Sequence, residues 1–249
     1  MTWSFQLYSA RNFQPWDKVL ETLKMIGYKN VEGFGGMYDT PGADALWDML
    51  DKNGLAMPSG HFSLDQLKDS NTGLRTAKTL RMKLVACPHI AADRRPNDAA
   101  GWRDFGKMLA EVGKPYRDEG YDFAWHNHDF EFQPLGDGSV PMTHILDAAP
   151  ELGWEMDVAW VIRGGADPKP WIEKYGSRIL AVHVKDIAPK GQNTDEDGWA
   201  DVGHGTVDWK GLCQLLRDKS AAKYFVMEHD NPSDATRFAR LSFAAAQRF

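Results

Sequence analysis

The chain has 249 residues and a mass of 28.0 kDa, which is long enough for one large domain with a substantial core. Its 35 acidic and 29 basic residues give a net charge of -6, and this balance argues against nucleic acid as a partner. Two cysteines, Cys87 and Cys213, provide neither a disulfide framework nor a thiolate zinc cluster. Without a membrane-spanning apolar stretch or a secretory pattern at the start, we expect a cytoplasmic protein with no membrane partner.

Short apolar runs alternate with amphipathic segments along the whole chain. The apolar runs predict strands at residues 5–9, 30–34, 56–61, 83–88, 121–128, 152–158, 179–186 and 224–229. The amphipathic segments predict helices at residues 16–26, 43–53, 72–80, 98–119, 142–148, 170–175, 209–219 and 233–248. Eight such alternations are typical of a parallel (β/α)8 barrel, and we expect a single α/β domain over residues 1–249.

Three predicted helices end at a glycine that precedes a strand. These glycines are Gly27, Gly54 and Gly120, and each stands where a left-handed residue commonly terminates a helix. One long polar segment, residues 190–201, follows the seventh predicted strand. In a barrel this segment belongs to the face where loops and substrates gather, so we expect it to be a substrate-side loop.

Four of the predicted strands end in acidic, basic or imidazole side chains. Side chains alternate along a strand, so residues two apart share one face. Such pairs are His126 with His128, Glu155 with Asp157, His183 with Lys185, and Glu228 with Asp230. If these faces point inward, carboxylates and imidazoles converge at the carboxyl ends of the strands, which is where barrels perform chemistry.

Mixed carboxylate and imidazole donors suit Mn²⁺, Mg²⁺, Co²⁺, Fe²⁺ or Zn²⁺. We predict that the ligands of such an ion are His126, Asp157, His183 and Glu228. A hydrogen-bonding role at a strand end is the simpler interpretation of any one histidine. Four such residues at the same end of four consecutive predicted strands favour a metal site.

Further polar and aromatic residues follow the predicted strands. We expect substrate contacts from Glu32, His61, Glu131, Trp160 and Arg163. The indole of Trp160 offers a flat surface for the C–H face of a sugar ring, although most tryptophans serve in packing. Lys185 has a structural alternative, which is an ion pair with Asp157 or Glu155.

Several short motifs support a resemblance to a known family over nearly the whole chain. They are FQLYSAR at 5–11, VEGF at 31–34, SGH at 59–61, WHNHDFEF at 125–132, MDVAW at 156–160, HVKD at 183–186, VGHGTVDW at 202–209, and Glu228. Together they resemble the xylose isomerase-like TIM barrels of the sugar phosphate isomerase/epimerase group. The resemblance implies a divalent cation, most often Mn²⁺, with Mg²⁺, Co²⁺ or Zn²⁺ as alternatives, at the four predicted ligands.

Two positions depart from the family pattern. His126 stands where the ketose epimerases have a glutamate that doubles as an acid or base, and Trp160 stands where many members have a substrate-binding histidine. These departures argue against a plain ketose 3-epimerase. They favour relatives that resemble inosose dehydratases or enzymes acting on 3-keto sugars and glycosides.

The resemblance implies an isomerase or epimerase that acts through an enediolate on a keto sugar or cyclitol. A lyase of the same fold is the enzymatic alternative, because loss of a β-oxygen can follow the same first step. The candidate proton carriers are Glu228, His128, and Lys185 with a pKa lowered by the cation.

Two further alternatives remain at this point. A metal-dependent endonuclease on the same barrel needs a basic DNA-facing surface, which the acidic composition disfavours. A non-catalytic, sugar-binding barrel with a degenerate site is the non-enzymatic alternative. We expect a small carbohydrate as the ligand, and a homo-oligomer or a partner subunit as the assembly.

Overall fold

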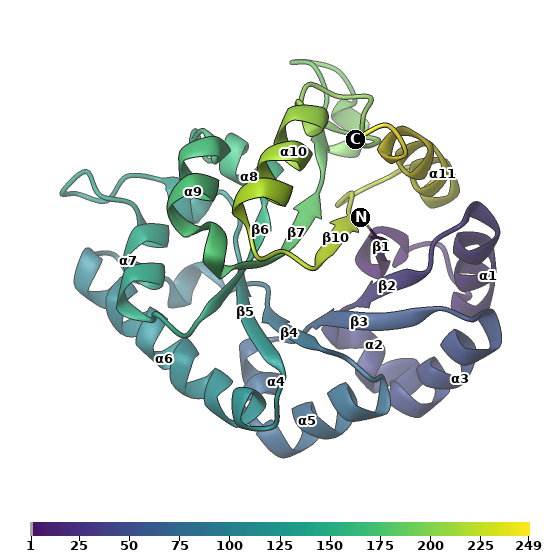
Figure 1. The fold of residues 1–249 in the computed structure, drawn as a ribbon, viewed down its shortest axis with the longest axis horizontal. Helices are drawn as coiled ribbons and strands as arrows, with labels where there is room; N and C mark the ends of the chain where they lie inside the picture. The colour runs from purple at the N-terminus through teal and green to yellow at the C-terminus, as the bar shows by residue number, and fades with distance from the viewer. Residues whose placement is uncertain (1) are drawn as a thin grey trace.

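The computed structural model describes residues 2–249, and its centre is a closed barrel of eight parallel strands (Figure 1). The barrel strands are β1 (Trp3–Gln6), β2 (Asn30–Gly33), β3 (Ala56–His61), β4 (Leu84–Cys87), β5 (Asp122–His126), β6 (Gly153–Asp157), β7 (Ile179–Val184) and β10 (Tyr224–Met227). Neighbouring strands follow chain order, and β10 pairs with β1 to close the ring. The predicted (β/α)8 barrel is confirmed.

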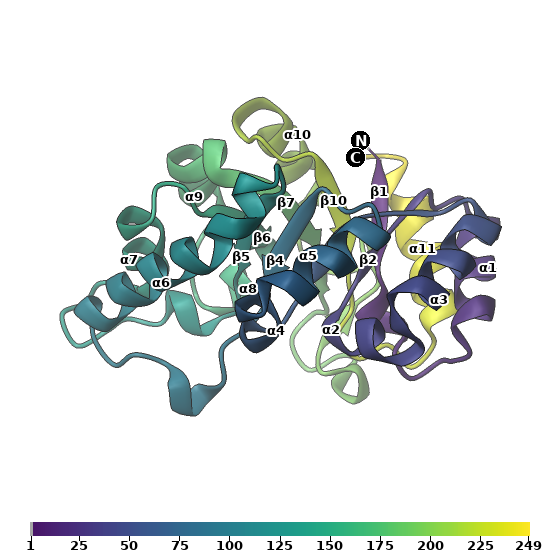
Figure 2. The same cartoon turned by 90° about the horizontal axis from the view of Figure 1, so that it is seen from below.

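Helices surround the strands on the outside of the barrel, as the two perpendicular views show (Figures 1 and 2). The described α-helices are α1 (Trp16–Ile26), α2 (Gly35–Met37), α3 (Ala43–Asn53), α4 (Leu64–Lys68), α5 (Ser70–Thr79), α6 (Ala99–Asp118), α7 (Pro141–Ala148), α8 (Val158–Arg163), α9 (Pro168–Tyr175), α10 (Trp209–Lys219) and α11 (Ala235–Ala246). Helices α1, α3 and α10 have the predicted bounds, whereas the short α2, α4 and α8 were not indicated by the sequence pattern. None of these helices combines the length and apolarity that crossing a membrane requires.

The barrel wall is apolar on its outer face. Phe5 of β1 packs against the rings of Tyr28 and Phe238, and Trp125 of β5 meets Phe105 of α6 edge-on. Parallel strands covered on both faces read as nearly continuous apolar runs, which is why the sequence pattern identified them. The main hydrophobic core therefore lies between the outer face of the barrel and the helices around it.

The inside of the barrel is layered. Leu84, Ala86, Ala124 and Ala181 form a small buried apolar cluster that is separate from the main core. Ala124 and Ala181 each lie two residues before a histidine, His126 or His183, on the same face of its strand. A polar layer therefore stacks on this apolar floor, towards the carboxyl ends of the strands.

The polar segment after β7 contains more order than predicted. It forms an antiparallel hairpin of β8 (Asp186–Ile187) and β9 (Trp199–Ala200). The Asp186 carboxylate accepts hydrogen bonds from the backbone N–H groups of Ile187, Gly203, Gly205 and Val207. A single buried carboxylate thus satisfies four backbone donors, and this long-range anchor orders the segment.

All three predicted helix stops have a positive φ, and Gly27 ends α1 with a φ of 121°. Gly54 ends α3 with a φ of 61°, and Gly120 follows α6 with a φ of 84°. An L-residue with a side chain adopts such angles only at a steric cost. The glycines therefore let the chain turn directly from each helix into the next strand.

Candidate active site

A cavity of about 820 Å³ opens at the carboxyl ends of the strands. Its wall includes His61, His126, His128, Trp160, Glu228 and Asp230. These residues come from strand ends, or from the residues that directly follow them, on several parts of the barrel. The predicted convergence of imidazoles and carboxylates at one mouth is therefore present in the fold.

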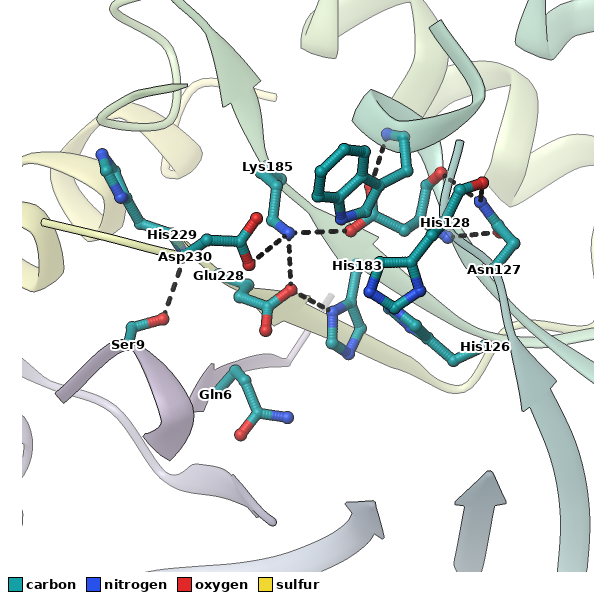
Figure 3. Close-up of polar contacts among 12 residues, drawn as sticks. Gln6, Ser9, His126, Asn127, His128, His183, Lys185, Glu228, His229 and Asp230 are labelled. Carbon is teal, nitrogen blue, oxygen red and sulfur yellow. Dashed lines mark hydrogen bonds and ion pairs between the residues drawn. The ribbon is translucent and has the colours of Figure 1, made fainter. Parts of the chain in front are cut away.

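The four predicted metal ligands lie together at the base of this cavity. One donor atom from each of His126, Asp157, His183 and Glu228 lies within 4.8 Å of the donor atoms of the other three. We call these four residues the candidate metal centre. His183 Nδ1 lies 2.9 Å from Glu228 Oε2, and the two side chains face each other in Figure 3.

The donor atoms of the candidate metal centre fit a divalent cation. Asp157 Oδ2 is buried and takes part in no hydrogen bond, and Lys185 Nζ lies 3.2 Å from it. Buried polar atoms are normally satisfied, so donor atoms without a hydrogen bond in a mixed carboxylate and imidazole cluster are consistent with a bound ion. That these residues bind a metal remains a prediction.

Asp157 is oriented by two local interactions. It is the N-cap of α8, where its Oδ1 accepts a hydrogen bond from Trp160 N at 2.9 Å. Its backbone N–H donates to Asn127 Oδ1 at 3.0 Å, while Asn127 Nδ2 donates to the Asp157 carbonyl at 3.1 Å. One carboxylate oxygen is therefore committed to the helix, and Oδ2 is left for the centre of the barrel.

Lys185 lies fully buried among three carboxylates (Figure 3). Its Nζ is 2.9 Å from Glu228 Oε2, 2.9 Å from Asp230 Oδ1 and 3.2 Å from Asp157 Oδ2. Burial alone would lower the pKa of Lys185, but the three carboxylates outweigh burial and raise it above the ordinary value. The lowering expected from a bound cation stays a prediction, whereas the alternative ion pair is present with Asp157 and not with Glu155.

The same ion pairs keep Glu228 ionised. Burial would raise its pKa, but Lys185 and His183 together hold the pKa well below the usual range. A carboxylate that stays charged at neutral pH suits a metal ligand better than a proton carrier.

His128 follows β5 and lies in the cavity wall. Its ring is 5.3 Å from the Trp160 indole, and its Nδ1 has no hydrogen-bond partner. Burial lowers the pKa of His128 to about 3. The imidazole is therefore neutral at physiological pH, and its low pKa makes it a weak base.

His61 and Glu32 lie at different depths. His61 lines the cavity, as a substrate contact must, and its Nε2 is 2.5 Å from Glu155 Oε2. Glu32 is fully buried below the cavity and bonds to Gln6 and His183, each at 2.7 Å, and to the Ser59 hydroxyl. These hydrogen bonds enclose the Glu32 carboxylate, and its substrate contact stays a prediction.

Glu32 and Glu155 share the positive charge of two histidines. Burial would raise the pKa of Glu32, but His61 and His183 lower it to about 2. Burial and the neighbouring Glu32 charge raise the pKa of Glu155 to about 7. The two carboxyl groups therefore titrate as a linked pair, and Glu155 is the member that holds a proton more readily.

Glu131 and Arg163 support loops outside the cavity. Glu131 is fully buried and accepts hydrogen bonds from Trp125 Nε1 and His128 N, both at 2.9 Å. Arg163 donates to the Asp197 carbonyl at 2.7 Å and stacks 3.2 Å over the Trp199 ring. Neither side chain is among the residues that line the cavity, and their substrate contacts stay predictions. Trp160 does line the cavity as expected.

Some cavity residues were not indicated by the sequence. Asp197 and Asn231 reach the wall from loops, and no periodicity or motif marks them. Glu155 is different, because strand parity places it on the inner face although it was not among the predicted ligands. Strand parity predicts which face of a strand carries a residue. It does not predict how deep in the barrel that residue lies, and this was the missing information for Glu155.

Comparisons with known proteins agree with this geometry. A family model described as xylose isomerase-like TIM barrel matches residues 20–245. Among solved structures, a sugar phosphate isomerase/epimerase from Parabacteroides distasonis shares 19% identity over 98% of this chain and 93% of that chain, with a TM-score of 0.81. The IOLI protein with a binding zinc atom shares 16% identity over 100% and 99% of the chains, with a TM-score of 0.77.

A probable 3-DHS dehydratase, AsbF from Bacillus anthracis, shares 12% identity over 99% of both chains, with a TM-score of 0.76. No curated protein sequence matches this chain. At such low identities the structural likeness shows the fold alone. The family model, however, spans most of the sequence, and the chain therefore belongs to the xylose isomerase-like TIM barrel family.

Proposed function

We propose that this chain is a divalent-metal-dependent isomerase or epimerase that acts on a keto sugar or cyclitol through an enediolate. The observation that supports this most directly is the candidate metal centre, whose four donor atoms lie within 4.8 Å of one another at the base of the cavity. The likeness to a sugar phosphate isomerase/epimerase points to the same class of reaction.

His126, Asp157, His183 and Glu228 would hold the ion. Mn²⁺ is our first choice, and Mg²⁺, Co²⁺ or Zn²⁺ are the alternatives, since the donor set accepts each of them. The zinc atom of the IOLI structure supports a divalent cation in a barrel of this kind. A bound cation would supply Lewis acidity that favours loss of a proton next to a carbonyl group.

The side chains around the centre supply the remaining functions. His128 lines the cavity and has an open Nδ1 for a substrate hydroxyl group, but its low pKa makes it a weak base for taking a proton from carbon. Charged Lys185 keeps Glu228 ionised and places a positive charge beside the reacting oxygen atoms. The Trp160 indole in the wall would lie against the C–H face of the sugar.

The cavity favours an uncharged sugar over a sugar phosphate. Among the wall residues that the structure describes, Arg11 is the one arginine or lysine. Its Nη1 donates to the carbonyl oxygens of Tyr8 at 2.9 Å and Asp230 at 2.7 Å. A substrate phosphate would therefore have to compete with these two carbonyl groups for the Arg11 guanidinium. A neutral keto sugar or cyclitol needs no such positive partner.

Elimination is a second candidate reaction, and Asp230 is the residue that favours it. Burial raises the pKa of Asp230 to about 6, and the residue lines the cavity. A carboxyl group of this pKa can deliver a proton to a leaving oxygen near neutral pH. Loss of water from the substrate, the reaction that the name of the probable dehydratase AsbF describes for that protein, would then follow the same first proton transfer.

Solvent deuterium exchange tests the proposal. With Mn²⁺ and a panel of keto sugars, inososes and 3-keto glycosides, we expect deuterium to enter at the carbon next to the carbonyl. A chelator, Glu228→Gln or His183→Ala should abolish exchange, whereas Asp218→Asn on the outer face of α10 should leave it unchanged. Exchange that persists in both site variants would contradict the proposal, and mass loss of one water would identify the lyase.

A further inference from the structure

A second group of donor atoms lies deeper in the barrel than the candidate metal centre. It consists of His61 from β3, His126 from β5, Glu155 from β6 and His183 from β7. One donor atom of each lies within 4.8 Å of the other three, and no member is more than 6% exposed. We call these four residues the deep cluster.

The deep cluster is arranged around one carboxylate oxygen. Glu155 Oε2 lies 2.5 Å from His61 Nε2, 3.5 Å from His126 Nδ1 and 3.7 Å from His183 Nε2. Three imidazole nitrogens and a carboxylate oxygen form a donor set that suits Zn²⁺, Co²⁺ or Fe²⁺ and is unusual for Mg²⁺ or Ca²⁺. His61 also lines the cavity, which gives an ion a path inward.

Two atoms of the deep cluster have no hydrogen-bond partner. His126 Nδ1 and Glu155 Oε1 are buried and take part in no hydrogen bond, in side chains that are 2% and 0% exposed. Leaving such atoms unsatisfied in a protein interior is unfavourable, because they have lost their bonds to water. A cation bound among the four side chains would remove this cost at His126 directly and would hold Glu155 by its carboxylate.

Charge also distinguishes the deep cluster from the candidate metal centre. The carboxylates of the upper site have Lys185 as a fixed counter-charge. Among the described residues, Glu32 and Glu155 form ion pairs with histidines only. The two fully buried carboxyl groups therefore have imidazoles as their counter-charges, and a cation bound by those imidazoles would supply the positive charge instead.

We propose that the deep cluster is a second divalent-cation site of zinc type, distinct from the candidate metal centre. The two sites share His126 and His183. The His183 ring presents Nδ1 to Glu228 at 2.9 Å and Nε2 to Glu32 at 2.7 Å, so its two nitrogens face different sites (Figure 3 shows the Glu228 side). A neutral imidazole has one lone pair, so a ring that binds both ions releases its N–H proton to solvent. A cation in the deep site then orients this shared ring, and the chain binds two ions. The upper ion of this pair rests on the proposed function. The ion in the deep cluster does not.

Cobalt binding tests this assignment without any measurement of activity. Equilibrium dialysis with Co²⁺, followed by metal analysis, should give two ions per wild-type chain and one per chain of Glu155→Gln or His61→Gln. Asp157→Asn removes a ligand of the upper site alone and keeps an amide oxygen for the N-cap of α8, so it should also retain one ion. Anomalous diffraction at the cobalt edge should then place that ion beside Glu155.

The outcomes separate the two proposals. One wild-type ion that Glu155→Gln removes and Asp157→Asn retains would support the deep site and refute the upper one. Two wild-type ions that persist in both Glu155→Gln and His61→Gln, or a single ion that only Asp157→Asn removes, would overturn the deep site. If circular dichroism shows that Glu155→Gln does not fold, the His61→Gln variant and anomalous diffraction from wild type still test whether the deep cluster binds an ion.

Discussion

Lys185 brings one fixed positive charge to three carboxylates inside the barrel, at 2.9, 2.9 and 3.2 Å. Removing one partner from a buried ion cluster costs more than the cluster itself contributes, because the remaining charges stay desolvated. Lys185 is therefore more important to the metal-free chain than to a chain in which a cation lies beside the same carboxylates.

Lys185→Met keeps the length of the side chain and removes its charge. We expect the variant to lose about 3–5 kcal/mol of unfolding free energy in chelator. With saturating Mn²⁺ the loss should be smaller, because the ion replaces the ammonium group. Urea unfolding measures both values, and Lys210→Met at an exposed position of α10 is the control. Equal stability of Lys185→Met and wild type in chelator would contradict the ion cluster.

His229 makes stability depend on pH through a ring that packs against α11 and does not line the cavity. Its Nδ1 accepts a hydrogen bond from Asn231 N at 3.1 Å, and its fully buried ring packs against Phe238, with Glu196 Oε2 3.4 Å from Nε2. Burial lowers the pKa of His229 to about 4, whereas an unfolded chain gives about 6.5. The unfolded state therefore binds the proton first as pH falls, and stability is lost between about pH 6.5 and 4.

His229→Gln removes this titration. Between pH 7.5 and pH 5, wild type should lose about 2 kcal/mol more unfolding free energy than the variant does. Urea unfolding across this pH range measures the difference, and other titrating groups cancel in the comparison. Parallel pH profiles of the two proteins would show that His229 is not held neutral.

Among the elements, those with local signals were predictable from sequence. Helices α1 and α3 end at glycines, and α10 begins at Asp208, whose side chain accepts a hydrogen bond from Gly211 N. Helix α8 was missed because its six residues, VAWVIR, continue the apolar run of β6. Only the capping of α8 by Asp157 separates it from the strand, and that cap depends on where Asn127 places the backbone.

The same distinction holds for the residues of the site. Those marked by local sequence patterns could be predicted, and those placed by long-range contacts could not. Strand parity was enough to place His126, Asp157, His183 and Glu228 together. The depth of Glu32 was not predictable, because its enclosure by hydrogen bonds comes from Gln6, Ser59 and His183 on three other strands. How deep a residue lies in the barrel depends on the register of all its strands. The sequence of a single strand does not reveal it.

The Asp186 carboxylate holds the β8–β9 hairpin and the segment that follows it, because it accepts hydrogen bonds from four backbone N–H groups. Asp186→Asn keeps the shape of the side chain, but its amide nitrogen cannot accept hydrogen bonds. About half of the four backbone donors then lose their acceptor, and we expect a loss of about 1–3 kcal/mol. Hydrogen exchange of residues 199–208 should become faster while β5 stays protected. Unchanged exchange of this segment, with exposed Asp218→Asn as the reference, would show that the anchor is dispensable.

For the whole molecule, barrel closure joins the two ends of the chain. Strand β10 pairs with β1, and α11 packs over the seam, as the adjacent termini in Figure 1 reflect. Fully buried Phe238 of α11 lies 5.5 Å from Phe5 of β1, and the Tyr28 hydroxyl donates to the Ala239 carbonyl at 3.0 Å. Contacts so distant in sequence make the last helix part of the same cooperative unit as the first strand.

Phe238→Ala tests whether that unit is the entire barrel. Removing a fully buried aromatic side chain should cost about 3–5 kcal/mol. If closure is cooperative, tryptophan fluorescence and far-ultraviolet circular dichroism should shift together to a lower urea midpoint. Phe243→Ala, at a half-buried position of the same helix, should cost less. Faster exchange confined to α11, with an unchanged global transition, would mean that the last helix opens alone and that β1 and β10 hold the seam without it.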